Sequence, residues 1–205
     1  MEGVFLTLIG AAIFSQSWHI LGMYAALSAV ETGAQNVTLV DKNMVGRGGA
    51  TIMAQMTVSA ALSEEEPDDW RQHLDDTLKA GRGLCDEPLA ARLCEDAPNR
   101  IRQMDSWKVG WARKDGRIRQ VMAPGHSVKR CCYVDFLNTG PAVSSTLRNR
   151  VSRTPGISRV SNLSVTDLVI ADGRCIGALG YDIPTGKPVV LHARSTIIAT
   201  GGLPK

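Results

Sequence analysis

Residues 36–62 read NVTLVDKNMVGRGGATIMAQMTVSAAL, and this stretch decides how the rest of the chain is interpreted. Asn36 to Val40 has the apolar character of a buried parallel strand, and Asp41 stands at its carboxyl end. A loop with three glycines follows, and small residues then begin a helix. A strand, an acidic residue and a glycine-rich loop in this order predict one edge of a doubly wound α/β sheet.

The acidic residue and the glycines predict a nucleotide site. In doubly wound folds a carboxylate at this position accepts hydrogen bonds from an adenosine ribose, which assigns Asp41 a role. Gly46, Gly48 and Gly49 have no Cβ, so their backbone N–H groups can approach a phosphate or a flavin ring. The alternative is a structural role, because strands that end in an acidic residue and a glycine turn are common in α/β proteins.

The amino-terminal segment is interpreted as the first strand of this unit. Residues 3–14 are apolar, but an acidic residue precedes them and polar residues end the run early, so we predict a strand over Val4–Ile9 and no membrane span. Gly10 stands at the expected phosphate turn, and Gly22 opens a helix that ends near Glu31. These glycines are twelve positions apart, where G-x-G-x-x-G requires five. Either the loop is remodelled, or this end is not the native sequence of a working domain.

Composition sets limits on the class of protein. A chain of 205 residues can form one domain of ordinary size. The net charge of +3 gives no sign of a nucleic-acid partner, and we predict none. Acidic residues are concentrated in residues 64–76 and basic residues in residues 100–130. Each run is either a solvated face or a contact with a subunit or an anionic substrate.

The five cysteines form no C-x-x-C pair and no spacing typical of metal ligands. We therefore predict free thiols, no metal site and a reducing, cytoplasmic location.

Helical patterns dominate the middle of the chain. Ser63 and Glu66 form a capping-box pattern, and helices are predicted around residues 70–78, 88–97 and 141–150. His73 is predicted to be an exposed polar residue rather than a ligand. His126 lies in a loop rich in hydrogen-bond donors and is either a catalytic or flavin-contacting group or a plain surface residue.

The carboxyl-terminal part predicts strands. Residues 157–194 alternate apolar and polar residues through two strands around a turn at Asp172-Gly173, with a further turn at Thr185-Gly186-Lys187, which predicts a small antiparallel β region. A final apolar strand over Ser195–Ala199 ends in small residues, where backbone can again approach a nucleotide. The predicted fold class is α/β, an incomplete domain with a Rossmann-like parallel sheet, helices and this antiparallel region. Its predicted parts are 1–62, a βαβ nucleotide-binding unit; 63–156, mainly helix and loop; and 157–205, the β region.

Seven motifs in this order carry a resemblance: VTLVDKN, GRGGATIMAQMTVSAAL, the run from Trp70 to Lys79, APNRIRQM, APGHSVKR, DFLNTG and STIIATGG. Together they resemble the flavoprotein subunit family of succinate dehydrogenase and fumarate reductase, whose wider group includes L-aspartate oxidase and the adenylylsulfate reductase flavoprotein. The resemblance implies the N-terminal part of an FAD-binding domain. It implies that the flavin is lined by Asp41 or Lys42 together with Gly48, Gly49, Ala50, Thr51 and Gln55, and that Ala199, Thr200, Gly201 and Gly202 form a second backbone approach to it. Gly10 and Gly22 of the predicted phosphate turn complete the candidate FAD residues.

The resemblance also sets expectations for the chemistry. Family members with covalent FAD carry a histidine that aligns with Ala50, so a non-covalent flavin is expected. The family transfers a hydride between a dicarboxylate and FAD and passes electrons to an iron–sulfur subunit, which is the implied partner. Through such partner subunits the resemblance also allows a peripheral position at the inner face of a membrane. The family's substrate-binding and proton-shuttling residues follow the ATGG strand, so no catalytic residue is assigned here.

Since only Leu203, Pro204 and Lys205 follow that strand, we expect an N-terminal fragment. The alternatives are a truncated, non-catalytic remnant that binds FAD weakly or not at all, and a flavoprotein resembling L-aspartate oxidase or adenylylsulfate reductase.

Overall fold

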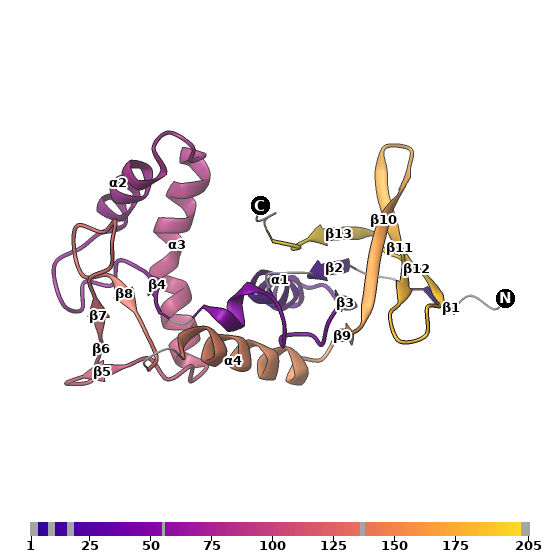
Figure 1. Cartoon of the computed structure of the whole chain (residues 1–205), viewed down its shortest axis with the longest axis horizontal. Helices are drawn as coiled ribbons and strands as arrows, with labels where there is room; N and C mark the ends of the chain where they lie inside the picture. The colour runs from indigo at the N-terminus through magenta and orange to yellow at the C-terminus, as the bar shows by residue number, and fades with distance from the viewer. Residues whose placement is uncertain (1–3, 8–10, 16–18, 55, 136–137, 202–205) are drawn as a thin grey trace. The chain divides into compact units, whose positions relative to one another are not determined.

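The structure is a computed structural model that describes residues 4–7, 11–15, 19–54, 56–135 and 138–201 (Figure 1). The chain forms two compact units: unit 1 comprises Met1–Met53 and Leu147–Lys205, and unit 2 comprises Ala54–Thr146. The three-part division at residues 62 and 156 stays a prediction, since these units divide elsewhere. The described helices are α1 (His19–Glu31), the short 3-10 helix η1 (Ala50–Met53), α2 (Trp70–Gly81), α3 (Glu87–Ser106) and α4 (Thr139–Arg153).

Unit 1 contains a parallel sheet with the strand order β13-β2-β3-β9. Its strands are β2 (Ala11–Ser15), β3 (Val37–Asp41), β9 (Ile157–Val160) and β13 (Ser195–Ile198). Helix α1 connects β2 to β3 and buries Met23, Ala26 and Leu27, which recur at the spacing of one helix face. Every described residue of β3 is buried, as expected for an inner strand of a parallel sheet. The predicted α/β class with a Rossmann-like sheet is confirmed.

The predicted first strand of the nucleotide unit is wrong. The strand paired with β3 is β2, whereas Val4–Thr7 forms β1 and pairs in parallel with β12 (Pro188–His192) in another sheet. Both segments are short and apolar, so composition alone does not separate them. Their chain positions do, because β2 ends three residues before α1 and can form the tight strand-to-helix turn of a βαβ unit.

A second sheet of unit 1 has the order β1-β12-β11-β10. Strands β10 (Leu163–Ala171) and β11 (Arg174–Asp182) form a hairpin through Asp172 and Gly173, whose φ angles of 48° and 72° suit a type I′ turn. Its core contains Leu163, Ala178 and Leu191 beside Val40 of β3. The antiparallel region predicted over residues 157–194 is therefore present, except that residues 157–160 belong to the parallel sheet as β9.

Unit 2 combines helices α2 and α3 with small antiparallel sheets. Its strands are β4 (Val58–Ser59), β5 (Arg113–Lys114), β6 (Arg117–Ile118), β7 (Gln120–Val121) and β8 (Cys131–Cys132). The capping box predicted at Ser63 is wrong, because α2 begins at Trp70 and its N-cap is Asp69. The Asp69 carboxylate accepts from Arg71 N and Gln72 N at 2.7 and 3.1 Å. None of the described helices is long and apolar enough to cross a membrane.

The acidic and basic runs of the sequence pair with each other inside unit 2. Glu66 lies 2.8 Å from Lys129, and the fully buried Arg130 lies 3.0 Å from Asp68 and 2.7 Å from Asp76. The side chains of Arg130 and Asp68 are 0% and 1% exposed. These runs are therefore not simply solvated faces, because part of each supplies a buried ion-pair network.

Replacing Arg130 with Met is expected to lower the free energy of unfolding of unit 2 by about 3–5 kcal/mol, because Asp68 and Asp76 keep their burial and lose their cation. The matched control is Arg100→Met, since Arg100 and its partner Asp96 are 45% and 47% exposed and this change should stay within about 0.5 kcal/mol. Urea unfolding followed by tryptophan fluorescence measures both, since three of the four tryptophans lie in unit 2. Equal losses in the two variants would contradict the assignment.

Candidate flavin-nucleotide site

The carboxyl edge of the parallel sheet in unit 1 gathers the predicted site residues. Ser15, the last residue of β2, is in register with Asp41, and Ile198 of β13 is in register with Phe14. All strands of the sheet run in the same direction, so the segments that follow β2, β3 and β13 leave from one edge. Asp41 and the start of the Ala199–Gly201 segment therefore come together at the edge where doubly wound folds bind ligands.

Asp41 fixes the start of the loop that follows β3. Its side chain is only 1% exposed, and Oδ1 accepts a hydrogen bond from the backbone N–H of Asn43 at 2.8 Å. This Asx-type contact turns the chain away from the strand. The loop is held again where the N–H of Val45 donates to Ser161 Oγ at 3.2 Å. The carboxylate is thus a structural anchor as well as the candidate ribose acceptor.

Glycines shape the remainder of the loop. Gly46 and Gly49 have φ angles of 73° and 71°, which favour residues without a side chain. A Cβ at Gly46 would lie 3.1 Å from Arg148 Cβ and 3.2 Å from Met23 Sδ, so this position also needs glycine for close packing. Gly46 is not among the residues that the resemblance implies for FAD, although it lies in the same loop.

The other predicted loop residues differ in exposure. Lys42 and Ala50 are exposed, Gly48 and Gly49 are half-buried, and Thr51 is buried in η1. After β13, Ala199 is buried, Thr200 is half-buried, and Gly201 is exposed with a φ angle of 80°. The predicted site residues Gly10 and Gln55 lie outside the described residues.

The strand-to-helix turn has no glycine at the positions that the fold normally uses. Gly22 is buried as the fourth residue of α1, and counting G-x-G-x-x-G back from it reaches Ser17 and His19. Gly10 precedes β2 and so does not follow the strand that feeds α1, which corrects its predicted place at the phosphate turn. The second glycine of the fingerprint normally lets backbone approach a pyrophosphate. His19 therefore departs from that pattern. The spacing back from Gly22 is the signal in the sequence that identifies this departure.

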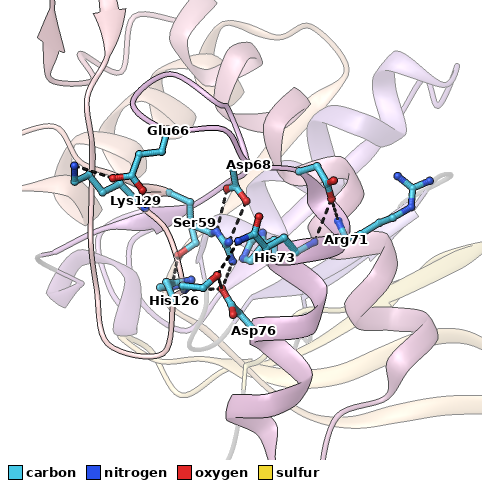
Figure 2. Close-up of polar contacts among 12 residues, drawn as sticks. Ser59, Glu66, Asp68, Arg71, His73, Asp76, His126 and Lys129 are labelled. Carbon is cyan, nitrogen blue, oxygen red and sulfur yellow. Dashed lines mark hydrogen bonds and ion pairs between the residues drawn. The ribbon is translucent and has the colours of Figure 1, made fainter.

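Unit 2 contains a polar cluster, made of Ser59, Asp68, His73, Asp76, His126 and Arg130. Figure 2 labels its members other than Arg130. His126 Nε2 lies 3.1 Å from Ser59 Oγ, and the rings of His126 and His73 are 5.8 Å apart. The prediction that His73 is exposed is wrong, since it is 3% exposed. His126 is half-buried, so it is not a plain surface residue.

The surroundings of both histidines lower their pKa values. Burial, the charge of Arg130 and the neighbouring His126 ring lower the pKa of His73 from 6.5 to about 4. Burial and Arg130 likewise lower the pKa of His126, against the opposing effect of Asp76 and Asp68. The Nδ1 atoms of both rings are buried without a hydrogen-bond partner among the described residues. Among those residues no group of three or more His, Cys, Asp or Glu could hold a metal ion.

The sheet order, the acidic end of β3 and the helix after β2 place unit 1 in the class of doubly wound α/β folds that bind dinucleotides at this edge. The family described as FAD binding domain matches residues 21–205, so the chain belongs to that family. This match begins after the altered turn.

Relatives define the branch of the family. L-aspartate oxidase from Mesorhizobium japonicum is 31% identical over 183 residues, which cover 89% of this chain and 35% of that protein. A mitochondrial succinate dehydrogenase flavoprotein from Xenopus laevis is 31% identical over 190 residues, covering 88% and 28%. The apo Sdh1 complex of Mycobacterium smegmatis superimposes with a TM-score of 0.88 and 28% identity over 97% of this chain and 35% of that chain. The chain is an FAD-binding domain of the succinate dehydrogenase and fumarate reductase type, and it spans about a third of the length of such relatives.

The free energy of unfolding of unit 2 should fall as the pH decreases from 6.5 to about 4, the window between the ordinary pKa of histidine and that of His73. In this window the unfolded chain binds more protons than the folded chain, so acid favours unfolding, by on the order of 1 kcal/mol per pH unit. Urea unfolding at several pH values measures the slope, and the His73→Gln/His126→Gln variant should lose much of it. Asp68 and Asp76 titrate in both proteins and cancel in the comparison. His192→Gln, which changes an exposed histidine of unit 1, is the control, and an unchanged slope in the double variant would refute the prediction.

Proposed function

We propose that this chain holds FAD without a covalent bond at the carboxyl edge of the β13-β2-β3-β9 sheet. The observation that carries the proposal is the register that brings Asp41 beside the end of β2, with the small residues after β13 on the other side. Asp41 would accept hydrogen bonds from the adenosine ribose. The other residues proposed for the site are Gly22, Lys42, Gly48, Gly49, Ala50, Thr51, Gln55, Ala199, Thr200 and Gly201.

The site residues fit the ribose and flavin ends of such a ligand better than its pyrophosphate. A buried carboxylate and positive-φ glycines at the end of β3 offer an acceptor and backbone N–H groups. Gly201, which follows β13 at the same edge of the sheet, allows close approach of backbone to the ligand. Ser17 and His19 stand where glycines normally admit the pyrophosphate, so binding weaker than that of a glycine-containing turn is expected.

The proposed reaction is that of longer flavoproteins such as the relatives named above. Bound FAD supplies hydride chemistry, and the substrate is proposed to be a small dicarboxylate, because relatives include an L-aspartate oxidase and a succinate dehydrogenase flavoprotein. Residues of this chain would bind and orient the flavin and limit water around it. An iron–sulfur subunit is the proposed partner that takes the electrons. All five cysteines are free thiols, which supports the proposed cytoplasmic, reducing location.

A second candidate is favoured by the altered phosphate turn. The chain would then be a remnant that binds FAD weakly or not at all. An oxidase resembling L-aspartate oxidase, or a flavoprotein resembling adenylylsulfate reductase, is the alternative within the enzyme class. Binding of FAD separates the remnant from both kinds of enzyme.

FAD affinity should respond in opposite directions to two changes. Asp41→Asn removes the charged acceptor and is expected to weaken binding about tenfold. Ser17→Gly/His19→Gly restores the glycine pattern and is expected to strengthen binding about tenfold, because backbone N–H groups can then reach the pyrophosphate. Quenching of flavin fluorescence measures both, with Asp172→Asn in the exposed β10–β11 turn as the control. An affinity that Asp41→Asn leaves unchanged would remove Asp41 from the site.

The flavin should leave the protein completely on acid precipitation. Ala50 occupies the position that aligns with the covalent histidine, and a methyl side chain has no atom that can bond to the flavin ring. The measurement compares flavin absorbance in the supernatant and in the washed pellet after denaturation. Yellow colour that stays with the pellet would contradict non-covalent attachment.

A further inference from the structure

Unit 1 contains a cavity of about 540 Å³ that is lined by three arginines from separate segments. Arg47 comes from the loop after β3, Arg148 from α4 and Arg159 from β9. No acidic side chain contributes to the described lining. Three positive charges that converge on one cavity repel each other, so an anion bound there would be stabilised.

The arginines have different tasks. Arg148 Nη1 donates to the carbonyl of Gly46 at 3.1 Å, which ties α4 to the loop after β3. Arg47 and Arg159 are exposed, and within the described part of the chain neither forms an ion pair. Their guanidinium groups are therefore available for a ligand. Arginine presents a planar fork of N–H donors that matches phosphate oxygens.

Neutral groups complete the lining. Ser161 Oγ accepts a hydrogen bond from Val45 N at 3.2 Å, which leaves its own O–H to donate, and the Asn149 amide adds further donors. Met44, Val45 and Ile157 supply an apolar part of the wall. A volume of 540 Å³ lies within the range of roughly 300–1,000 Å³ that small-molecule sites occupy. Cationic forks beside apolar side chains suit a phosphate attached to an apolar or aromatic body.

The cavity shares the loop after β3 with the proposed flavin residues but differs from them in the rest of its lining. Ile157 and Arg159 of β9 line the cavity. Strand β9 is at one edge of the sheet and β13 is at the other, with β3 and β2 between them. Neither Asp41 nor the Ala199–Gly201 segment contributes to its lining. We propose that this cavity is a second site, separate from the FAD site, that binds a small phosphate monoester with an apolar or aromatic body.

The test is isothermal titration of the 205-residue chain with phenyl phosphate, which has the proposed chemistry and does not resemble the adenylate half of FAD. Saturable binding at one site is expected. The Arg47→Gln and Arg159→Gln variants should each weaken it about tenfold, since each removes charge-assisted hydrogen bonds. Arg174→Gln, at the exposed first residue of β11, is the matched control and should change affinity less than about twofold. Both test variants leave the Arg148 contact with Gly46 intact, so folding is preserved.

Two further measurements distinguish this site from the flavin site and from nonspecific anion binding. Affinity should rise as the pH increases through about 6, where the phosphate becomes a dianion while arginine stays charged. Binding should persist when FAD is present in excess, and it should persist in Asp41→Asn, so failure of the flavin proposal would not affect it. Absence of saturable binding, equal effects of Arg174→Gln and Arg159→Gln, or displacement of phenyl phosphate by FAD would each overturn the proposal.

Discussion

Unit 1 depends on the parallel pairing of β2 with β3 on one side and β13 on the other. This pairing determines which residues stand at the carboxyl edge, because parallel strands must end on the same side of the sheet. A shift of one residue would exchange the two faces of β3, so that Val37 and Leu39 would take the side now occupied by Thr38 and Val40. The hydrophobic core and the position of Asp41 are therefore consequences of the same register.

The loop after β3 serves two candidate sites of different character through one piece of backbone. Asp41 and Ser161 hold this loop through Asn43 N and Val45 N, and Arg148 holds the carbonyl of Gly46. The start of the loop lies at the proposed flavin edge, whereas Met44, Val45 and Arg47 line the arginine cavity.

Unit 2 is organised around a charge that has no access to water. The guanidinium of Arg130 donates hydrogen bonds to the carboxylates of Asp68 and Asp76 in the acidic run. Burial, and after it the charge of Arg130, lowers the pKa of both neighbouring histidines. Because removal of charges from water is costly, such a network is stable only while all its partners are present. Part of the acidic run and part of the basic run therefore meet in the folded unit.

The sequence by itself determined the α/β class, the helices near residues 22–31, 70–78, 88–97 and 141–150, and the hairpin turn at Asp172-Gly173. These features depend on local periodicity and on residues that favour positive φ, and both can be recognised from residues close together in the chain. The tertiary structure decided that Ala11–Ser15, not Val4–Ile9, pairs with β3, that His73 is buried, and that Arg47, Arg148 and Arg159 share a cavity. These outcomes depend on contacts between segments distant in the chain, where several apolar or charged segments are equally suitable by composition and only packing selects one.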